Sequence, residues 1–368
     1  MRQIIIFLSI LPSLLFSQSQ VPQTLRSQFN GNYGYTIIGN THNSFDNWQN
    51  PPPPCQMLTS SSATLTLSAN QNISAAYLYW GGIGDGTYNP VVSLNGTNYS
   101  SQSTFIGYPQ SSQIISYFGS FHDVTSQIIS SGNGIYNFSN FDLNPIIGNY
   151  CTTADYFSGW YLVVVYEDIS LPNVQLNVYD GFNVLSLFFN NAITPIQIDN
   201  LNISSTSNAQ MTYIAWNGSP NLYSSPLFTN TESISIDTNI LSNAQNPFNN
   251  PFNGTNSFTG SSSSWNMDVD TYDISNFINI GDTVIDFTFT TLWRRFIQTI
   301  ITSIPSELPD ATVNIDTITG QDLCDNQTLA IDFTVLNVNS NDTLPAGTPI
   351  SIFANNTIFL GTDRKSVV

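Results

Sequence analysis

Short alternating runs of apolar and polar residues recur along the chain, and this period is typical of β-strands. In residues 62–68 the alternation is strict, with Leu65 and Leu67 on one side and threonines on the other, which indicates a strand with one buried face. Residues 159–167 lose the alternation, as expected of a central strand covered on both faces. Similar β-rich runs occur at 73–82, 91–99, 134–141 and 174–182. The pattern predicts an all-β protein built of jelly-roll-like sandwiches.

Two parts of the chain resemble each other in composition and order, which indicates an internal duplication. AAYLYWGG around Trp80 is echoed by MTYIAWNG around Trp216, and the segment that follows Asp123 is echoed by the segment that follows Asp273. Each aspartate precedes a Thr or Ser two residues later and can cap a turn, so we expect both to be structural. The two parts are therefore expected to fold as related β-sandwiches.

The chain is longer than one hydrophobic core usually organises, so several domains are expected. Beyond residue 308 a Pro-punctuated link leads to alternation at Ile331, Phe333 and Val335, as in the opening strands of an Ig-like module. The expected organisation is a signal peptide at 1–19, a first β-sandwich at 20–172, a related second β-sandwich at 173–308 and a partial Ig-like repeat at 309–362.

The N-terminus has the pattern of a secretory signal. Arg2 stands before an apolar run from Ile4 to Phe16, which is too short to span a bilayer and leads into polar sequence. We expect cleavage after Ser17 or Ser19. No later segment approaches transmembrane length, so the mature protein is expected outside the cell or on its outer surface.

The three cysteines are interpreted in the light of this expected export, because thiols in an oxidising compartment tend to pair. Cys55 and Cys151 are the natural couple, and closing a loop of that length would restrict the unfolded chain by about 4 to 5 kcal/mol in the entropic model. Cys324 then lacks a partner in this sequence. No CxxC or Cys/His spacing indicates a metal site.

The charge balance excludes several kinds of partner. Lys and Arg total 6 against 24 Asp and Glu, a formal net charge of −18. Nucleic acids and anionic membranes attract clustered basic residues, which this chain does not have. Lys365 is the only lysine, so the Lys to Asn or Asp cross-links of many adhesins are excluded before it. We interpret residues 363–368 (DRKSVV) as translated sequencing adapter.

A series of short motifs carries a resemblance to a known group of proteins. The runs AAYLYWGGIGDG, FHDVTSQIISSGNGIYNFSNFDL, GWYLVVVYEDISLPNVQLNVYDGF, NMDVDTYDIS and LPDATV occur in this order. Together they resemble the N-terminal region of large secreted surface proteins of gliding bacteria that use a type IX secretion system. The resemblance covers most of residues 30–360. It implies a longer chain that continues through adhesin-type Ig-like repeats to a gliding-motility-associated sorting domain.

The resemblance brings no catalytic residues, and the sequence departs from it in two ways. The sorting domain is absent, so we expect the sequence to be truncated at its C-terminus. Arg294 and Arg295 stand where a neutral strand is expected, which leaves the strand register there open.

Signals of catalysis are weak. The chain has two histidines, His42 and His122, and neither lies in a GxSxG or HExxH motif. A glycoside hydrolase needs two facing carboxylates, for which Glu167, Asp168 and Asp180 are the candidates. Turn and strand-end acids are far more often structural, so we expect no enzyme.

Two binding sites are conceivable. The run MDVDTYDIS offers Asp268, Asp270 and Asp273 as calcium ligands, because hard cations take carboxylate oxygens. The glycine and distal glutamate of an EF-hand loop are missing, and an acidic loop before a strand is the plainer interpretation. Tyr88, in a loop near Asp85, is the candidate aromatic platform for a sugar.

The tryptophans give no such platform, because Trp80, Trp160 and Trp216 lie in predicted strands and are expected in the core. We therefore expect a non-enzymatic secreted or surface-anchored protein, an adhesin or gliding-associated surface component. Its expected partner is an extracellular surface ligand or glycan. The alternative is a carbohydrate-binding or carbohydrate-active extracellular protein.

Overall fold

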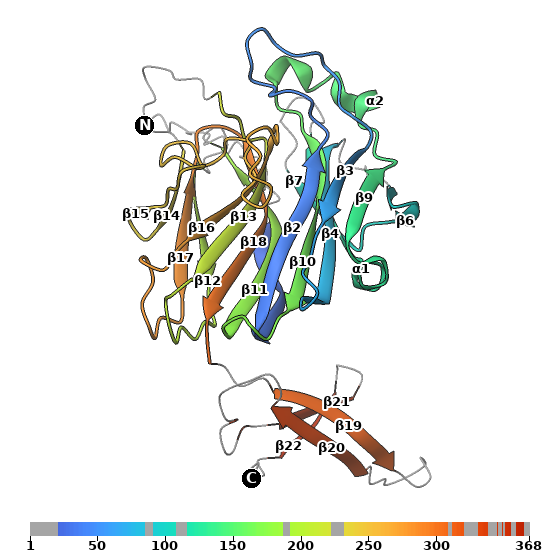
Figure 1. The fold of residues 1–368 in the computed structure, drawn as a ribbon, viewed down its shortest axis with the longest axis vertical. Coiled ribbons are helices and arrows are strands. Elements are labelled where there is room, and N and C mark those ends of the chain that lie inside the picture. Colours follow the sequence, from blue (N-terminus) through green and yellow to red (C-terminus); the bar gives the residue numbers. More distant parts are fainter. Residues whose placement is uncertain are drawn as a thin grey trace, which may run out of the picture.

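The regular structure of the chain is almost entirely antiparallel β-sheet (Figure 1). The computed structural model describes residues 21–84, 91–107, 116–186, 192–221, 232–307, 311–319, 330–337, 344, 348, 350–354 and 358–363. The expectation of an all-β sandwich protein is confirmed. The expected signal peptide lies outside the described residues.

The first unit (residues 33–167) consists of two sheets. Its inner sheet has the order β2 (Tyr33–Thr41), β10 (Ser158–Glu167), β4 (Asn72–Gly84), β8 (Ser116–Asp123) and β7 (Ser103–Gly107). Its outer sheet has the order β3 (Ser61–Leu65), β9 (Gly134–Ser139), β5 (Val92–Leu94) and β6 (Thr97–Tyr99). Its short helices are α1 (Thr125–Ser131), α2 (Asn144–Ile147) and the 3-10 turn Cys151–Thr153.

The second unit (residues 174–305) repeats this plan. Its inner sheet has the order β11 (Val174–Leu185), β18 (Arg295–Pro305), β13 (Gln210–Trp216) and β16 (Met267–Asp273). Its outer sheet has the order β12 (Ile193–Ile198), β17 (Ile285–Thr290), β14 (Ser233–Ile236) and β15 (Asn239–Ile240). An additional strand, β1 (Val21–Gly31), extends the inner sheet beyond β11.

The two units share one strand order. When the strands of each unit are numbered along the chain, with the edge strands β1 and β7 left out, both inner sheets have the order 1-8-3-6 and both outer sheets 2-7-4-5. The sequence echoes fall on equivalent strands, because Trp80 lies in β4 and Trp216 in β13, while Asp123 ends β8 and Asp273 ends β16. The duplication inferred from the sequence therefore has a counterpart in the fold.

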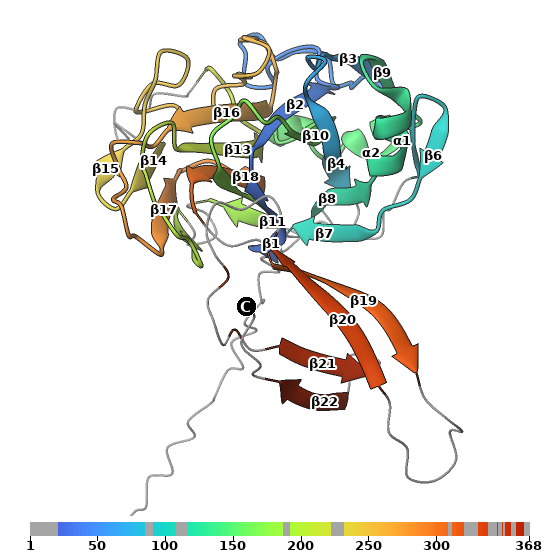
Figure 2. The same ribbon diagram turned by 60° about the horizontal axis from the view of Figure 1, so that its bottom comes forward.

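The four sheets form successive layers, and Figure 2 shows the two sandwiches side by side. The inner sheets face each other, so their strands are covered on both faces, and β10 is buried from Ser158 to Val165. The outer sheets have one solvent face, so β12 and β17 alternate between exposed and buried residues. The loss of alternation in residues 159–167 thus has the expected cause.

Strand β1 crosses the expected boundary between the sandwiches. We expected residues 20–172 to form the first sandwich, but β1 pairs with β11 of the second unit, for example Thr24 with Asp180. Only Asn32 separates β1 from β2, which joins the first unit. Periodicity indicates that a segment is a strand but not which sheet it joins, so this assignment needed the tertiary structure.

Large aromatic rings fill the layers between the sheets, and several of them have a hydrogen-bonded polar end. Trp80, Trp160 and Trp216 are fully buried, as expected. The Trp216 indole Nε1 donates to Gln298 Oε1 at 2.7 Å, and the Tyr161 hydroxyl lies 2.6 Å from the Thr299 hydroxyl. The Trp216 bond lies within the second unit, whereas the Tyr161 contact crosses between the units, as does the hydrogen bond that Gln298 Nε2 donates to Ser120 O at 3.2 Å. Such bonds let polar groups lie inside a core, and the two that cross tie the units together.

Beyond the sandwiches the described strands form two hairpins. Strand β19 (Ala311–Thr319) pairs with β20 (Ala330–Asn337), and β21 (Ile350–Ala354) pairs with β22 (Ile358–Asp363). The partial Ig-like repeat stays a prediction. Cys324 and residues 364–368 lie outside the described residues. Within the described part of the chain, no helix is long and apolar enough to cross a membrane.

Candidate functional site

Long connections gather at one end of the two units, which is the upper end in Figure 1. Strands β2, β4, β11 and β13 end there, and β10, β16 and β18 begin there. The longest of the described connections at this end are residues 42–60, 140–157 and 241–266. Because loops held by a rigid scaffold are the usual place of function, this long-loop end is the candidate functional site.

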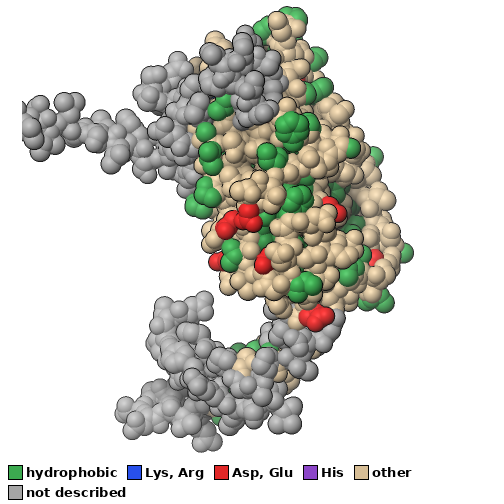
Figure 3. All heavy atoms as spheres, turned by 90° about the vertical axis from the view of Figure 1, so that its left-hand side faces the viewer, with side chains coloured by type: hydrophobic (Ala, Val, Ile, Leu, Met, Phe, Trp, Pro, Cys, Tyr) green, Lys and Arg blue, Asp and Glu red, His purple; other side chains and the backbone are tan. Residues whose placement is uncertain are grey.

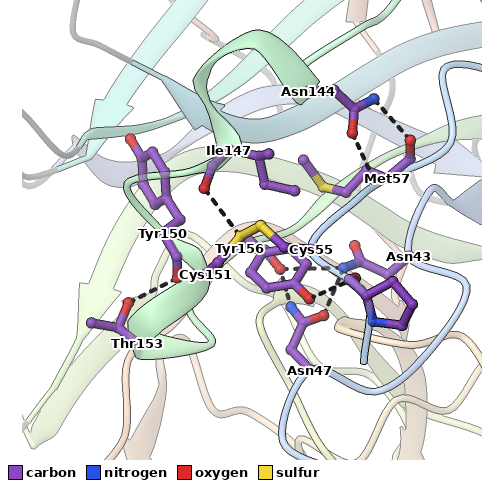
Figure 4. Close-up of a disulfide and its surroundings, with 11 residues drawn as sticks. Asn43, Asn47, Cys55, Met57, Asn144, Ile147, Tyr150, Cys151, Thr153 and Tyr156 are labelled. Carbon is purple, nitrogen blue, oxygen red and sulfur yellow. Dashed lines mark hydrogen bonds between the residues drawn. A yellow bond between two sulfur atoms is a disulfide. The ribbon is translucent and has the colours of Figure 1, made fainter. Parts of the chain in front are cut away.

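The predicted disulfide is present at this end, between Cys55 and Cys151 (Figure 4). The two Cα atoms are 5.8 Å apart, within the normal range for a disulfide. The bond joins the connection after β2 to the connection after β9. Met57 N donates to Asn144 Oδ1 and Asn144 Nδ2 donates to Met57 O, both at 2.9 Å. These contacts tie the two loops of the first unit together.

Arg294 and Arg295 are buried at the same end, and they correct the expectation of a neutral strand. Arg294 Nη1 lies 2.5 Å from Asp155 Oδ2, and Arg295 Nε lies 3.0 Å from Glu232 Oε1. Buried guanidinium groups require such partners, and here they come from loops distant in sequence. The register is regular at this point, because Arg295 pairs with Leu185 of β11.

Burial also acts on the acids of these pairs. It raises the pKa of Asp155 and of Glu232, and the neighbouring arginines oppose the rise. Asn217 Nδ2 donates to Asp155 Oδ1 at 3.1 Å. Sequence reasoning missed this set of residues. The one available signal was a pair of arginines in a chain that has only 6 basic residues.

The third described arginine is also paired. Arg26 of β1 forms an ion pair with Asp180 of β11 and lies 3.7 Å from the centre of the Phe121 ring. The Tyr79 hydroxyl donates to Asp180 Oδ2 at 3.1 Å. Every arginine of the described part of the chain therefore faces a carboxylate. Figure 3 accordingly shows acidic and no basic side chains on the face that it presents.

The candidate glycosidase acids do not face one another. Asp168 lies in the turn after β10, where it accepts hydrogen bonds from Ser170 N at 3.0 Å and Asn70 Nδ2 at 2.7 Å. The bonds from Ser170 lower the pKa of Asp168. Asp180 lies inside β11 with different partners, and burial raises its pKa. Glu167 ends β10 opposite Asn72. These positions have structural explanations.

The calcium candidates are only partly brought together. Asp268 and Asp270 are fully buried in β16 and two residues apart, so they share a face. Asp273 is exposed at the end of β16, where its Oδ1 accepts a bond from Ser275 N at 2.8 Å. Burial raises the pKa of Asp270 to about 6 and that of Asp268 well above its ordinary value, with repulsion from Asp270 adding to the effect on Asp268.

The described residues contain no group of three or more His, Cys, Asp or Glu arranged to hold a metal ion. The sugar-platform candidate Tyr88 and its neighbour Asp85 lie outside the described residues.

The histidines have packing roles. His42 is buried, its Nδ1 lies 3.1 Å from the Ser158 hydroxyl, and burial lowers its pKa to about 4. His122 Nδ1 lies 2.6 Å from Ser100 O. Asp123 Oδ1 accepts a bond from Thr125 N at 2.9 Å, which closes a turn ahead of α1. The N-cap residue of α1 is Val124, so Asp123 is structural as expected but is not the helix cap.

Comparison with known proteins adds little. No family model matches the chain, and no curated protein matches it. Among solved structures, the chain is similar to the major capsid protein P2 of bacteriophage PM2, at 10% identity and a TM-score of 0.21. That match covers 73% of this chain and 97% of the capsid chain. A likeness this low carries no argument about fold or function.

Proposed function

We propose that this protein is a non-enzymatic secreted or surface-displayed binding module of the adhesin type, built of two jelly rolls. The strand orders 1-8-3-6 and 2-7-4-5 in both units support the jelly-roll interpretation. The resemblance to the surface proteins of gliding bacteria supports display on the outer surface.

The disulfide between Cys55 and Cys151 is the observation that carries the proposal. Structural disulfides persist in oxidising compartments and are rare in the cytosol. This one fixes two loops at the long-loop end, where a binding surface would have to keep its shape. Asp168 and Asp180, two of the three candidate catalytic acids, are by contrast engaged in a turn and in an ion pair.

The charge of the surface limits the partner. The described arginines are paired with Asp155, Asp180 and Glu232, so an anionic partner would meet carboxylates and no unpaired guanidinium. A neutral glycan or a protein with basic patches fits this surface electrostatically.

Protease treatment of intact cells tests the location. The expected result is loss of the protein while a periplasmic marker survives, together with weaker attachment of a deletion strain. A protein that resists protease until the cells are lysed would overturn the proposal. So would hydrolysis of any member of a polysaccharide panel.

Carbohydrate binding is the second candidate, and aromatic residues at the long-loop end favour it. Phe45 and Phe248 have 44% and 52% of their surfaces exposed. Trp48 of the first unit and Trp293 of the second have ring centres 5.3 Å apart. Exposed rings can stack on sugar faces. A glycan array that compares the wild type with the Phe45→Ala and Phe248→Ala variants tests this, and no binding at high protein concentration would exclude it.

A further inference from the structure

A group of oxygen atoms converges on the Thr255 hydroxyl, in the long connection before β16. Thr255 Oγ1 lies 2.8 Å from Asn246 Oδ1, 2.6 Å from Asn253 Oδ1 and 3.0 Å from each carboxylate oxygen of Asp270. A hydroxyl carries one proton, so it can donate to only one of these four acceptors. The other acceptor oxygens around this hydroxyl therefore receive no proton from it.

Reorienting the amides does not remove this conflict. Asn253 Nδ2 donates to Gln245 O at 2.9 Å, which fixes Asn253 Oδ1 toward Thr255. Turning the Asn246 amide would still leave three acceptor oxygens for one proton. Ser257 adds a further oxygen, because its Oγ lies 3.1 Å from Asp270 Oδ1. We call Asn246, Asn253, Thr255, Ser257 and Asp270 the oxygen cluster.

The oxygen cluster is buried, and no arginine of the described residues forms an ion pair with its carboxylate. Asn246 and Asp270 have no exposed surface, and only Ser257 of the cluster is partly open to solvent. The nearby Asp268 is fully buried too, and its Oδ2 has no hydrogen-bond partner among the described residues. Arg295 is already paired with Glu232. Asp270 accepts hydrogen bonds from the hydroxyls of Thr255, Ser257 and Tyr213. Neutral donors offset only part of the cost of burying a carboxylate, so this region favours positive charge.

The backbone shapes the oxygen cluster. Gly254 has a φ of +73°, a conformation that turns the chain sharply between Asn253 and Thr255. Asp268 Oδ1 accepts a hydrogen bond from Gly254 N at 2.7 Å, which holds this turn against β16. Asn253 Oδ1 thereby meets the Thr255 hydroxyl, which in turn contacts Asp270.

We propose that the oxygen cluster binds a calcium ion, with Asp270, Thr255, Asn246 and Asn253 as ligands and Ser257 at the solvent side. Carboxylate, amide and hydroxyl oxygens suit a hard cation, and calcium accepts an irregular shell of about 6 to 8 oxygens. Magnesium demands a stricter octahedron, and softer metals prefer nitrogen or sulfur ligands, which the oxygen cluster does not offer. Asp273 is not a ligand. The site is independent of whether the protein is an adhesin.

Thermal unfolding of the whole chain in chelator and in millimolar calcium tests the proposal. A ligand that binds only the folded state raises the unfolding midpoint, here by about 5 °C at a calcium concentration about 100-fold above the dissociation constant. Terbium gives a second readout, because the Tyr213 hydroxyl lies 3.4 Å from Asp270 Oδ2 and can sensitise its emission. Calcium should displace terbium and quench this emission.

The Asp270→Asn variant should lose both the calcium shift and the terbium emission, whereas Asp273→Asn, in the same strand, should keep both. If the Asp270→Asn variant fails to fold, chelation and terbium displacement on the wild-type protein still test whether calcium binds. The proposal is overturned if calcium leaves the midpoint unchanged and terbium does not bind. The proposal is also overturned if the thermal unfolding midpoint does not respond to calcium but rises as the pH falls. That result would mean that protons, and not a metal ion, neutralise Asp270. Equal losses in the two variants would overturn the ligand set.

Discussion

The two units have one strand order but stabilise their long-loop ends by different chemistry. In the first unit a disulfide joins Cys55 to Cys151 across two loops. In the second unit the Arg295 to Glu232 ion pair and the oxygen cluster occupy the same end. The strand order determines which loops lie next to each other, but it does not determine which interactions stabilise them. The two units should therefore fail under different conditions, which makes the comparison testable.

Removal of the disulfide should have the largest effect. The Cys55→Ser/Cys151→Ser double variant is expected to lose about 4 to 5 kcal/mol, because the unfolded chain regains the entropy of a loop of 96 residues. Denaturant unfolding measures the loss. Limited proteolysis should show new cleavage in residues 42–60 and 140–157 first. Simultaneous cleavage in residues 241–266 would mean that the two ends are not independent.

Breaking the buried ion pair should have the next largest effect, and in the second unit. Arg295→Met leaves Glu232 buried without its cation, which is expected to cost about 3 to 4 kcal/mol in urea unfolding. The Arg295→Met/Glu232→Leu double variant serves as the control and should recover most of this loss. A double variant as unstable as the single one would contradict the charge argument.

Acid should weaken the first unit. The pKa of His42 is about 4 in the folded state and about 6.5 in the unfolded state, so the unfolded chain takes up the proton first as the pH falls. Stability from this group is complete above pH 6.5 and falls by about 3 kcal/mol by pH 4. Unfolding of wild type and His42→Gln across this range measures it, with His122→Gln as the control. Glu232 acts in the opposite direction, because its raised pKa favours folding as the pH falls.

Equivalent turn residues should have small and equal effects. Asp123→Ala and Asp273→Ala each remove one hydrogen bond to the backbone two residues later, to Thr125 N and Ser275 N. We expect a loss of about 1 kcal/mol for each in denaturant unfolding. Clearly unequal losses of unfolding free energy would show that the two duplicated turns no longer contribute equally to stability.

Local patterns explain what could be predicted. The strand periods, the echo of Trp80 by Trp216 and the turn bonds of Asp123 and Asp273 depend on residues close in sequence. The disulfide followed from having three cysteines and a secretory signal. For the calcium candidates, the sequence predicted one part of the arrangement, because the strand period places Asp268 and Asp270 on one face. Periodicity could not show that the other oxygens come from the connection that precedes β16.

The sequence by itself thus determined the strands, their duplication and the cysteine pair, because these depend on side-chain period and on residue identity. Only the tertiary structure decided that β1 joins the sheet of the second unit, because the residue pattern of a strand does not indicate which strand it pairs with. It also decided that Arg294 and Arg295 are buried beside Asp155 and Glu232. A buried charge is tolerated only where the fold brings its partner within a few ångströms, and no local rule states where that partner lies.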